Sequence, residues 1–501
     1  MARRPTGGAG AWLAIGVGFL CLLTAGGSMT TTDAVVAYDV TRNIVEHRTV
    51  ATSGDLLGKE AYRGRDGRYY SPFGIAQSVW NIPFYVAGRA MSSRVGLAAG
   101  RADTIPKAAV ALATVPAVAC LAWVGFAILL RLGADPRRAL VASLLLVVAT
   151  PLWPYSGFGF NQPLTALFLW ASVLGALGAD GDRLPPLWGA GIASGLAVLT
   201  RHELLAAAAI VVVFVAWRAR RRAWAVGHYL AGLTPLILAW GFLNWWRFGN
   251  PLESGYFRDD TPRYGSSIVE GTWGLLASPY ASLFLYCPLA VLAVGGLRAL
   301  HRRCPSVAWL FVVLTTTYFL LYASLGNWMG GRSYGPRYLV LLLPGLVLPL
   351  AFWTPHGRLR VAAVAIAVLS VAVQIPGVLV DYSKVRVDRA IAGATVAQDM
   401  RWSGTPLFLN TRAAVANGRR AIAYLAGGEP AADLRSTDPA RLSMAMAFSL
   451  DLWWLYLSYM GAIGRGAALL IATSLAMGSA VALALAFRAT APELRSSFDD
   501  E

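Results

Sequence analysis

Charged residues are scarce in this chain of 501 residues. Asp, Glu, Lys and Arg together make up 14% of it, whereas ordinary soluble domains contain about a quarter. Hydrophobic residues make up 56%, and the mean hydropathy is +0.54. This balance excludes a soluble globular enzyme. Apolar runs of about 20 residues, long enough to cross a bilayer, recur from Trp12 to the neighbourhood of Arg488 and predict a polytopic membrane protein.

Acidic residues and cysteines are also few. The 26 Asp and Glu stand against 43 Lys and Arg, so the net charge is +17. In a soluble chain this surplus would suggest a nucleic-acid partner, but here the basic residues bracket the apolar runs, which is typical of cytoplasmic loops. The four cysteines lie far apart without CxxC or Cys/His spacing, so neither a disulfide framework nor a structural zinc site is indicated.

The familiar motifs of nucleotide and hydrolase chemistry are missing. The sequence contains no P-loop, GxSxG, HExxH or GxGxxG in a suitable context. Nucleotide-driven chemistry on the inner side therefore has no visible site.

The basic residues set the predicted topology. Arg3 and Arg4 precede the first apolar run, Ala11 to Ala25, and place its start inside; a cleaved signal peptide is the alternative for this run. Assigning the other loops by charge gives about twelve spans with both ends cytoplasmic. The turns expected inside are 131–138, 218–228, 298–305 and 354–360, and the segments expected outside are 29–106, 247–280, 326–337 and 381–450.

These spans predict an all-α polytopic membrane protein in three parts. We expect a transmembrane module over 1–380, a small extracytoplasmic segment over 381–450, and a terminal transmembrane helix region with a cytoplasmic tail over 451–501. Richness in Ala, Gly and Arg hints at a bacterial chain. The expected location is therefore the bacterial plasma membrane, with the long segments on its outer face.

One segment is short for the two spans it must supply. Residues 186–217 must cross twice, although two full spans need about 40 residues. A single span would leave Arg201 in hydrocarbon and put the cluster 218–222 outside, against the positive-inside rule. We therefore expect two short helices with Arg201, His202 and Glu203 recessed in a protein-lined cavity. Unusually short spans often mark a binding site.

The first outer segment holds two candidate interfacial helices and a candidate base. Residues 32–47 and 74–89 carry apolar side chains near helical spacing, which is typical of helices that lie on a membrane. Asp33 follows directly after the first span, and Asp39 lies six residues later. A carboxylate held there can take a proton from an acceptor hydroxyl. The alternative is structural, with Thr32 or Asp33 capping the first interfacial helix.

Basic and aromatic residues precede the second interfacial helix. Arg63, Arg65 and Arg68 lie on the side of the membrane that usually lacks basic residues, so they contact either lipid headgroups or a substrate. An aromatic belt accounts for Tyr69 and Tyr70. A substrate role would place Arg68 and Tyr69 against a sugar or an acceptor.

The segment before the tenth span is the most unusual in the chain. Residues 326–338 contain four glycines, two arginines, two tyrosines and a tryptophan. Glycines let a backbone approach a ligand, Arg332 and Arg337 can grip phosphate oxygens, and Trp328 can stack on a sugar. We favour a ligand site here over an interfacial loop with snorkelling arginines. The aromatic turn at 244–255 is interpreted as a tryptophan belt followed by an ordinary turn.

These segments resemble the GT-C superfamily of membrane glycosyltransferases, including the protein O-mannosyltransferases of glycosyltransferase family 39 and the aminoarabinose transferase of lipid A. The order of a first span, an acidic surface helix and a second helix headed by 67–74 is similar to theirs. Leu199-Thr200-Arg201-His202-Glu203 looks like their LTK/LTR turn, and Pro336-Arg337-Tyr338-Leu339 before Leu343-Pro344 is similar to their RYxxxxxP segment. The resemblance covers most of the chain in architecture, through short motifs.

The resemblance implies a membrane glycosyltransferase that moves a sugar from a polyprenyl phosphate to an acceptor hydroxyl outside the cell, with inversion. Asp33 matches the position of the catalytic carboxylate, and Arg332, Arg337 and Arg201 would hold the donor phosphate. A phosphate leaving group needs cations rather than a general acid, so one carboxylate and arginines suffice. The candidates for sugar or acceptor binding are Trp328, Tyr338, His202, Glu203, Asp39, Tyr69 and Arg68.

Two departures from the family pattern bear on cofactors. Many relatives carry an adjacent Asp-Glu pair in the first outer loop, whereas Asp33 is followed by Ala34. The aminoarabinose type has a lysine in the turn that here holds Arg201. No cofactor is therefore assigned, and the need for a divalent metal stays open. The expected partners are the polyprenyl-phosphate-linked sugar, a glycan, lipid or protein acceptor, and membrane lipids.

The alternative function is a transporter or flippase of a lipid-linked saccharide. Such a protein would also have many spans and cationic outer loops. It usually needs ionisable groups near the membrane centre and two related halves. Neither is clear in this sequence.

Overall fold

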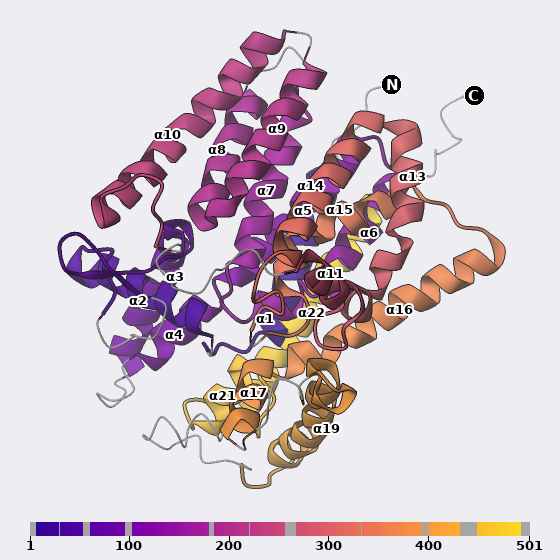
Figure 1. The fold of residues 1–501 in the computed structure, drawn as a ribbon. Helices are drawn as coiled ribbons and strands as arrows, with labels where there is room; N and C mark the ends of the chain where they lie inside the picture. The colour runs from indigo at the N-terminus through magenta and orange to yellow at the C-terminus, as the bar shows by residue number, and fades with distance from the viewer. Residues whose placement is uncertain are drawn as a thin grey trace, which may run out of the picture.

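A computed structural model of the protein shows an almost wholly helical bundle (Figure 1). It describes residues 7–29, 31–53, 61–95, 103–179, 185–219, 221–255, 267–331, 333–391, 393, 398, 400–430 and 448–491. Within this part, the β-structure is a single two-stranded sheet. The predicted all-α class is confirmed.

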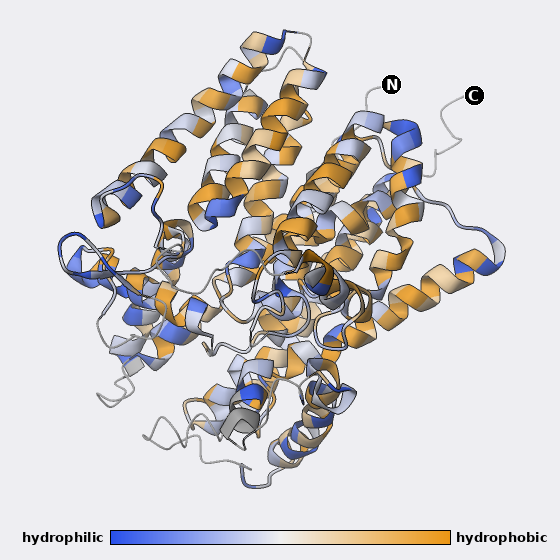
Figure 2. Cartoon of the chain, in the orientation of Figure 1, coloured by the Kyte–Doolittle hydropathy of each residue, from blue (hydrophilic) through white to orange (hydrophobic). Residues whose placement is uncertain are grey.

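Long apolar helices form the bundle. Within the described residues, five helices are long and apolar enough to cross a membrane: Thr104–Arg131, Arg222–Phe248, Pro305–Ala323, Gly357–Leu379 and Arg465–Ala489. The first comprises α4 (Thr104–Ala111) and α5 (Thr114–Arg131), and the others are α10, α14, α16 and α22. Figure 2 shows hydrophobic residues along these helices and hydrophilic residues gathered at their ends. The protein is thus an integral membrane protein, while the count of twelve spans stays a prediction.

Shorter helices complete the bundle between these long ones. The remaining elements that contribute to it are α1 (Gly7–Thr24), α6 (Pro136–Val148), η3 (Pro154–Ser156), α7 (Gln162–Ala176), α8 (Pro185–Thr200), α9 (Leu205–Arg218), α11 (Ile268–Ala277), α12 (Leu283–Tyr286), η5 (Pro288–Leu292), α13 (Ala293–Arg303), η6 (Arg337–Leu342), α15 (Leu343–Val347) and η7 (Leu348–Phe352).

Small residues let the helices approach one another closely. A Cβ added at Gly191 of α8 would collide with the backbone of Tyr229 in α10, and one added at Gly232 would collide with the backbone of Trp188. On the other side of the bundle, Ser479 of α22 donates a hydrogen bond to the carbonyl of Gly16 in α1 at 2.9 Å. Lipid supplies no hydrophobic drive for helix association, so such close packing holds the bundle together.

The two surface helices form as the sequence predicts. α2 spans Thr32–His47 and α3 spans Ile75–Val95, and a hairpin of β1 (Tyr62–Arg63) and β2 (Tyr69–Tyr70) lies between them. The N-cap of α2 is Thr31, whose hydroxyl accepts from the backbone N–H of Ala34 at 3.4 Å. The residue that caps this helix is therefore Thr31, and not Thr32 or Asp33.

α8 and α9 confirm that residues 186–217 form two short helices rather than one. A 3₁₀ turn, η4 (His202–Leu204), joins them. The indole N–H of Trp240 in α10 donates to Nδ1 of His202 at 2.6 Å, so Nε2 carries the proton and donates to the carbonyl of Pro72 at 3.0 Å. Burial lowers the pKa of His202 from 6.5 to about 4, which keeps the ring neutral. This neutral histidine ties the turn to α10 and to the segment before α3.

The C-terminal part of the chain packs on the end of α1. It contains α17 (Tyr382–Ile391), η8 (Trp402–Gly404), α19 (Pro406–Leu425) and α21 (Trp453–Tyr459), and has an apolar cluster of its own that includes Tyr424 and Leu455. The indole N–H groups of Trp453 and Trp454 donate to the last carbonyls of α1, at 2.7 and 2.9 Å. These bonds satisfy carbonyls that a helix end leaves without partners.

A buried ion pair fixes the same junction. Nζ of Lys384 in α17 lies 2.7 Å from Oδ1 of Asp451, and the same oxygen accepts hydrogen bonds from Tyr456 at 2.7 Å and from Ser28 at 3.2 Å. Ser28 follows α1 and leads into α2. The pair therefore fixes the chain just before the surface helix that carries Asp33.

We predict that Lys384→Met lowers the stability of the protein by about 3–5 kcal/mol, because it leaves the Asp451 carboxylate buried without a cation. Thermal unfolding in detergent measures the loss as a lower Tm. The double variant Lys384→Met/Asp451→Leu should recover part of it, since an apolar pair of similar volume needs no desolvation of charge. The control is Arg89→Met, because Arg89 pairs with Glu46 at 2.8 Å but is 53% exposed. Equal effects of the two single changes would contradict the prediction.

The lowered pKa of His202 predicts that the stability of the folded protein depends on pH. Its folded pKa of about 4 lies below the ordinary 6.5, so between these values the unfolded chain binds the extra proton. The stabilisation is complete above about pH 6.5 and is lost as the pH falls towards 4. His202→Gln keeps a donor and an acceptor but does not titrate, so its Tm should fall less steeply over this range than that of the wild type. Identical slopes for the wild type and His202→Gln would refute the assignment.

Candidate functional site

Asp33 in the first turn of α2 faces an arginine from a distant part of the chain. Nη1 of Arg337 donates to Oδ2 of Asp33 at 3.2 Å, and the two side chains are only 12% and 19% exposed. Arg337 begins η6, directly after the glycine-rich segment. Gly335 has φ +72°, and a Cβ there would collide with Tyr286. The turn that directs Arg337 back towards α2 therefore requires glycine.

Tyr338 contacts two arginines. Its ring stacks on Tyr322 with 5.3 Å between centroids and an interplanar angle of 18°. Cζ of Arg337 lies 5.0 Å and Cζ of Arg201 lies 5.6 Å from the centroid of Tyr338. Cations over the faces of tyrosine rings are attracted by the ring quadrupole. Tyr338 thus connects the predicted segment at 326–338 with the predicted turn at 201–203.

Arg201 forms an ion pair within its own turn. Its Nε donates to Oε1 of Glu203 at 2.6 Å, and its Nη1 donates to the side-chain oxygen of Asn161 at 3.3 Å. Burial alone would raise the pKa of Glu203, but the charge of Arg201 holds that pKa below its ordinary value. The sequence predicts Arg201 as a phosphate ligand; in this structure its charge is paired with a carboxylate.

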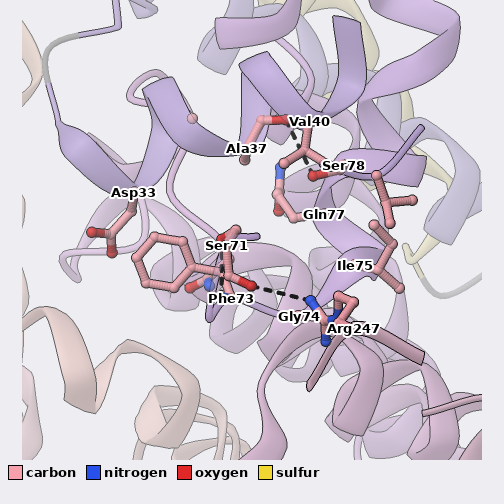
Figure 3. A pocket seen from close by; sticks show the side chains of 13 residues that line it. Asp33, Ala37, Val40, Ser71, Phe73, Gly74, Ile75, Gln77, Ser78 and Arg247 are labelled. Atoms are coloured by element: carbon pink, nitrogen blue, oxygen red, sulfur yellow. Dashed lines mark hydrogen bonds between the residues drawn. The ribbon is translucent and has the colours of Figure 1, made fainter. Parts of the chain in front are cut away.

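A pocket lies beside Asp33, between α2, the segment before α3 and the end of α10 (Figure 3). It holds about 440 Å³ of empty space, the open solvent at its mouth included. In the view of Figure 3, Asp33 and Arg247 lie on opposite sides of Ser71 and Phe73. The full lining is Asp33, Ala37, Val40, Val50, Ser71, Phe73, Gly74, Ile75, Gln77, Ser78, Gly159, Asn161 and Arg247.

Arg247 is a buried cation that sequence reasoning missed. Its side chain is inside the protein, with 5% of the residue exposed, and donates to the carbonyls of Leu243 and Ser71 at 3.2 and 3.1 Å and to the amide oxygen of Asn244 at 2.8 Å. All three acceptors are neutral, and within the described part of the chain no carboxylate forms an ion pair with it. A buried charge without a counter-ion is costly, and the three neutral oxygens offset part of that cost.

A signal for Arg247 is present in the sequence. It stands at the end of a span predicted to exit outside, where basic residues are uncommon. The neighbouring Trp245 and Trp246 favoured the interpretation as a tryptophan belt. An arginine paired with the asparagine three residues before it is the feature that separates this turn from a simple belt.

Other sequence-predicted residues lie away from this pocket or outside the described residues. Trp328 is buried, and a Cβ at Gly274 of α11 would collide with its ring, so it packs beneath that helix. Tyr69 and Arg68 belong to the exposed side of the hairpin, where Nε of Arg68 lies 3.9 Å from a carboxylate oxygen of Asp66. Arg332 lies outside the described residues.

Asp39 is a buried carboxylate with a different set of partners. It accepts hydrogen bonds from the backbone N–H and the hydroxyl of Ser53, both at 2.7 Å, and pairs with Arg42 at 3.0 Å. Asn43 donates to it at 3.3 Å. These contacts hold the segment after α2 against the helix. His202 and Glu203 are likewise held by protein groups, so Asp33 is the carboxylate that lines the pocket.

The donor set of a metal site is not assembled in the described residues. No group of three or more His, Cys, Asp or Glu lies close enough there to hold a metal ion.

Comparison with known proteins gives a likeness in structure but not in sequence. No family model matches the chain, and no curated protein matches it. ArnT from Cupriavidus metallidurans bound to undecaprenyl phosphate is 15% identical, with a TM-score of 0.50, over 97% of this chain and 78% of ArnT.

Two further solved structures are similar at lower scores. The apo state of the same ArnT has 14% identity and a TM-score of 0.48 over 95% of this chain and 75% of that one. The apo oligosaccharyltransferase of Archaeoglobus fulgidus has 13% identity and a TM-score of 0.45 over 92% and 64%. Because scores below 0.5 do not establish a shared fold, only the first likeness bears on the architecture. This chain shares the fold of ArnT, and the expected polytopic helical architecture is confirmed.

Proposed function

We propose that this protein is a membrane glycosyltransferase of the GT-C type, which moves a sugar from a polyprenyl-phosphate donor to an acceptor hydroxyl with inversion. One observation carries the proposal: in a single pocket of a GT-C fold, the carboxylate of Asp33 lies opposite the buried guanidinium of Arg247, which has no carboxylate partner among the described residues. The presence of undecaprenyl phosphate in the ArnT structure supports a lipid-phosphate donor.

Asp33 is the proposed base. Its carboxylate takes the proton of the acceptor hydroxyl as the acceptor oxygen forms a bond to the anomeric carbon. The bond from that carbon to the phosphate oxygen breaks, and the electron pair leaves with the lipid phosphate. Attack from the face opposite the leaving group inverts the anomeric centre. No general acid is required, because a phosphate leaves as an anion.

The arginines are the proposed phosphate ligands. Arg247 already lines the pocket as a cation without an acidic partner, whereas Arg337 is paired with Asp33. A donor phosphate competes for Arg337, so its arrival releases Asp33 to act as a base. Arg201, and Arg332 from the same segment as Arg337, complete the proposed cationic set. The ring of Tyr338 contacts the guanidinium groups of both Arg337 and Arg201 and holds these two side chains in position.

The distribution of basic residues supports a pocket on the extracytoplasmic face. Nη2 of Arg303 donates to the carbonyl of Gly133 at 2.6 Å, so the basic end of α13 and the basic turn at 131–138 lie at the same end of the bundle. α2 and α3 lie at the other end (Figure 1). By the positive-inside rule the basic end is cytoplasmic. The pocket beside α2 then opens outward, as a polyprenyl-linked donor requires.

Asp33→Asn tests the base. We expect kcat to fall by about 10²–10⁴-fold, because an amide cannot accept the proton. The loss of the ion pair with Arg337 should also lower the Tm, so both proteins are assayed at a temperature well below either Tm. Transfer of radiolabelled sugar from polyprenyl-phosphate donors by purified protein in lipid nanodiscs is the measurement. Asp66→Asn, at an exposed carboxylate of the same segment, is the control. If Asp33→Asn stays within a few-fold of the wild type, the base lies elsewhere, with Asp39 and Glu203 as the next candidates.

Arg247→Met tests the phosphate site. Loss of a charged hydrogen-bond donor costs about 1.5–3 kcal/mol, so we expect the KM for the donor to rise by about 10–100-fold, with Arg247→Lys intermediate. Arg65→Met is the matched control, because Arg65 is exposed and lies over Trp245, 5.0 Å from its ring centroid, outside the pocket lining. An unchanged KM would remove Arg247 from the site. Movement of a lipid-linked saccharide across vesicles without sugar transfer would instead establish the flippase alternative.

A further inference from the structure

We infer that the exposed face of α13 binds the phosphate of an anionic phospholipid headgroup, with Arg298 and Arg302 as the phosphate ligands. This face lies at the basic end of the bundle, whereas α2 and the pocket beside it lie at the other end (Figure 1). The inference therefore does not depend on the proposed transfer reaction. Three features carry it: the order of apolar and basic residues along one helix face, the scarcity of carboxylates around that face, and a tryptophan at the membrane surface.

One face of α13 is apolar at its start and basic at its end. Val294, Arg298 and Arg302 follow one another at intervals of four residues, and all three side chains are exposed, whereas Gly296 and Leu300 on the opposite side are buried. Residues four apart on a helix are surface neighbours, so the valine and the two arginines form one line along α13. Figure 2 shows the same change from hydrophobic to hydrophilic along this helix. A phospholipid has this order of chemistry too, with acyl chains followed by a charged headgroup.

The positive charge of this face has no acidic counterpart in the sequence around it. Residues 271–380 include no Asp or Glu at all. Within the part of the chain that the structure describes, no carboxylate forms an ion pair with Arg298 or Arg302. The planar fork of an arginine matches the oxygens of a phosphate, and two arginines one turn apart can hold the same phosphate.

A neighbouring turn brings one carboxylate, which already has a structural role. Arg303 donates to the carbonyl of Gly133 at 2.6 Å, which brings the turn 131–138 next to the end of α13. Asp135, the single acidic residue of that turn, accepts from the backbone N–H of Arg138 at 3.0 Å and caps α6. The charge on α13 is therefore left for an anion from outside the chain.

An exposed tryptophan places this face at the membrane surface. Trp309, near the start of the spanning helix α14, is 52% exposed, and the ring of His301 in α13 meets it edge-on with 6.1 Å between centroids. Exposed tryptophans at the ends of spans are typical of the boundary between hydrocarbon and headgroups. His301 stands between Arg298 and Arg302, so the two arginines lie at the depth of the headgroups. A lipid phosphate is present at this depth, and basic sites at the ends of spans bind such headgroups.

The positive-inside rule alone would explain the presence of these basic residues but not their arrangement. That rule counts Lys and Arg in a loop, whichever side of a helix they occupy. Arg358 and Arg360 at the start of α16 are also exposed and belong to another basic turn. Because they are two residues apart, they point to different sides of the helix. They form a matched pair with the same charge and no shared face.

Native mass spectrometry of the purified full-length protein in detergent tests the site. Phosphatidylglycerol or phosphatidylcholine with the same acyl chains is added, and the dissociation constant of each is measured. The wild type should bind phosphatidylglycerol more tightly by about ten-fold or more, because each arginine near a lipid phosphate adds to the attraction. Arg298→Gln/Arg302→Gln should lose most of this preference at an unchanged Tm, since both side chains are exposed. Arg358→Gln/Arg360→Gln, which removes the same charge, should keep it.

Three results would overturn the inference. Equal binding of the two lipids by the wild type would exclude a headgroup site. An equal loss of preference in both double variants would show that only the net charge of this end matters. Binding of sn-glycerol 3-phosphate as tightly as phosphatidylglycerol, with the same dependence on Arg298 and Arg302, would assign the face to a soluble phosphate.

Discussion

The ion pair between Asp33 and Arg337 joins the two halves of the candidate site. Asp33 lies at the start of a surface helix close to the first span, and Arg337 lies 304 positions later, at the start of η6. In a partly buried setting the pair is attractive only while both groups are held in place, because each ion alone would be costly to desolvate. Thr31 caps α2, Gly335 turns the chain before Arg337, and Tyr338 supports the guanidinium. Together, these three features hold the ion pair in place.

The distribution of charge around this pair gives the pocket its character. Arg337 and Arg201 each face a carboxylate, whereas Arg247 donates only to neutral oxygens. Of the three arginines, the one without an acidic partner among the described residues is the one that the sequence did not single out. In the proposed function, Arg247 is the cation that receives a phosphate, and Asp33 is the base that a competing anion releases. In that proposal, donor binding and release of the base are coupled without any change of fold.

Local sequence patterns predicted those helices whose apolar face is determined by residues close to one another in the sequence. The helix at Thr32–His47 and the break between α8 and α9 follow from apolar spacing and from the cost of placing Arg201 in hydrocarbon. The short hairpin β1–β2 and the N-cap at Thr31 were not predicted. The N-cap depends on one local hydrogen bond, from the N–H of Ala34 to the hydroxyl of Thr31. The hairpin is held to a segment far away in the sequence by the bond from the N–H of Arg65 to the carbonyl of Arg247.

The sequence by itself determined that this is a polytopic helical membrane protein, that a carboxylate at residue 33 stands at a surface helix, and that an arginine-rich, glycine-rich segment comes before a late span. These features are local, because hydropathy, loop charge and turn residues act over a few residues. Only the tertiary structure decided which cation meets which anion: Arg337 faces Asp33, Arg201 faces Glu203, and Arg247 faces neutral oxygens. Pairing at a buried site depends on desolvation and distance between helices remote in the chain, which no local pattern records.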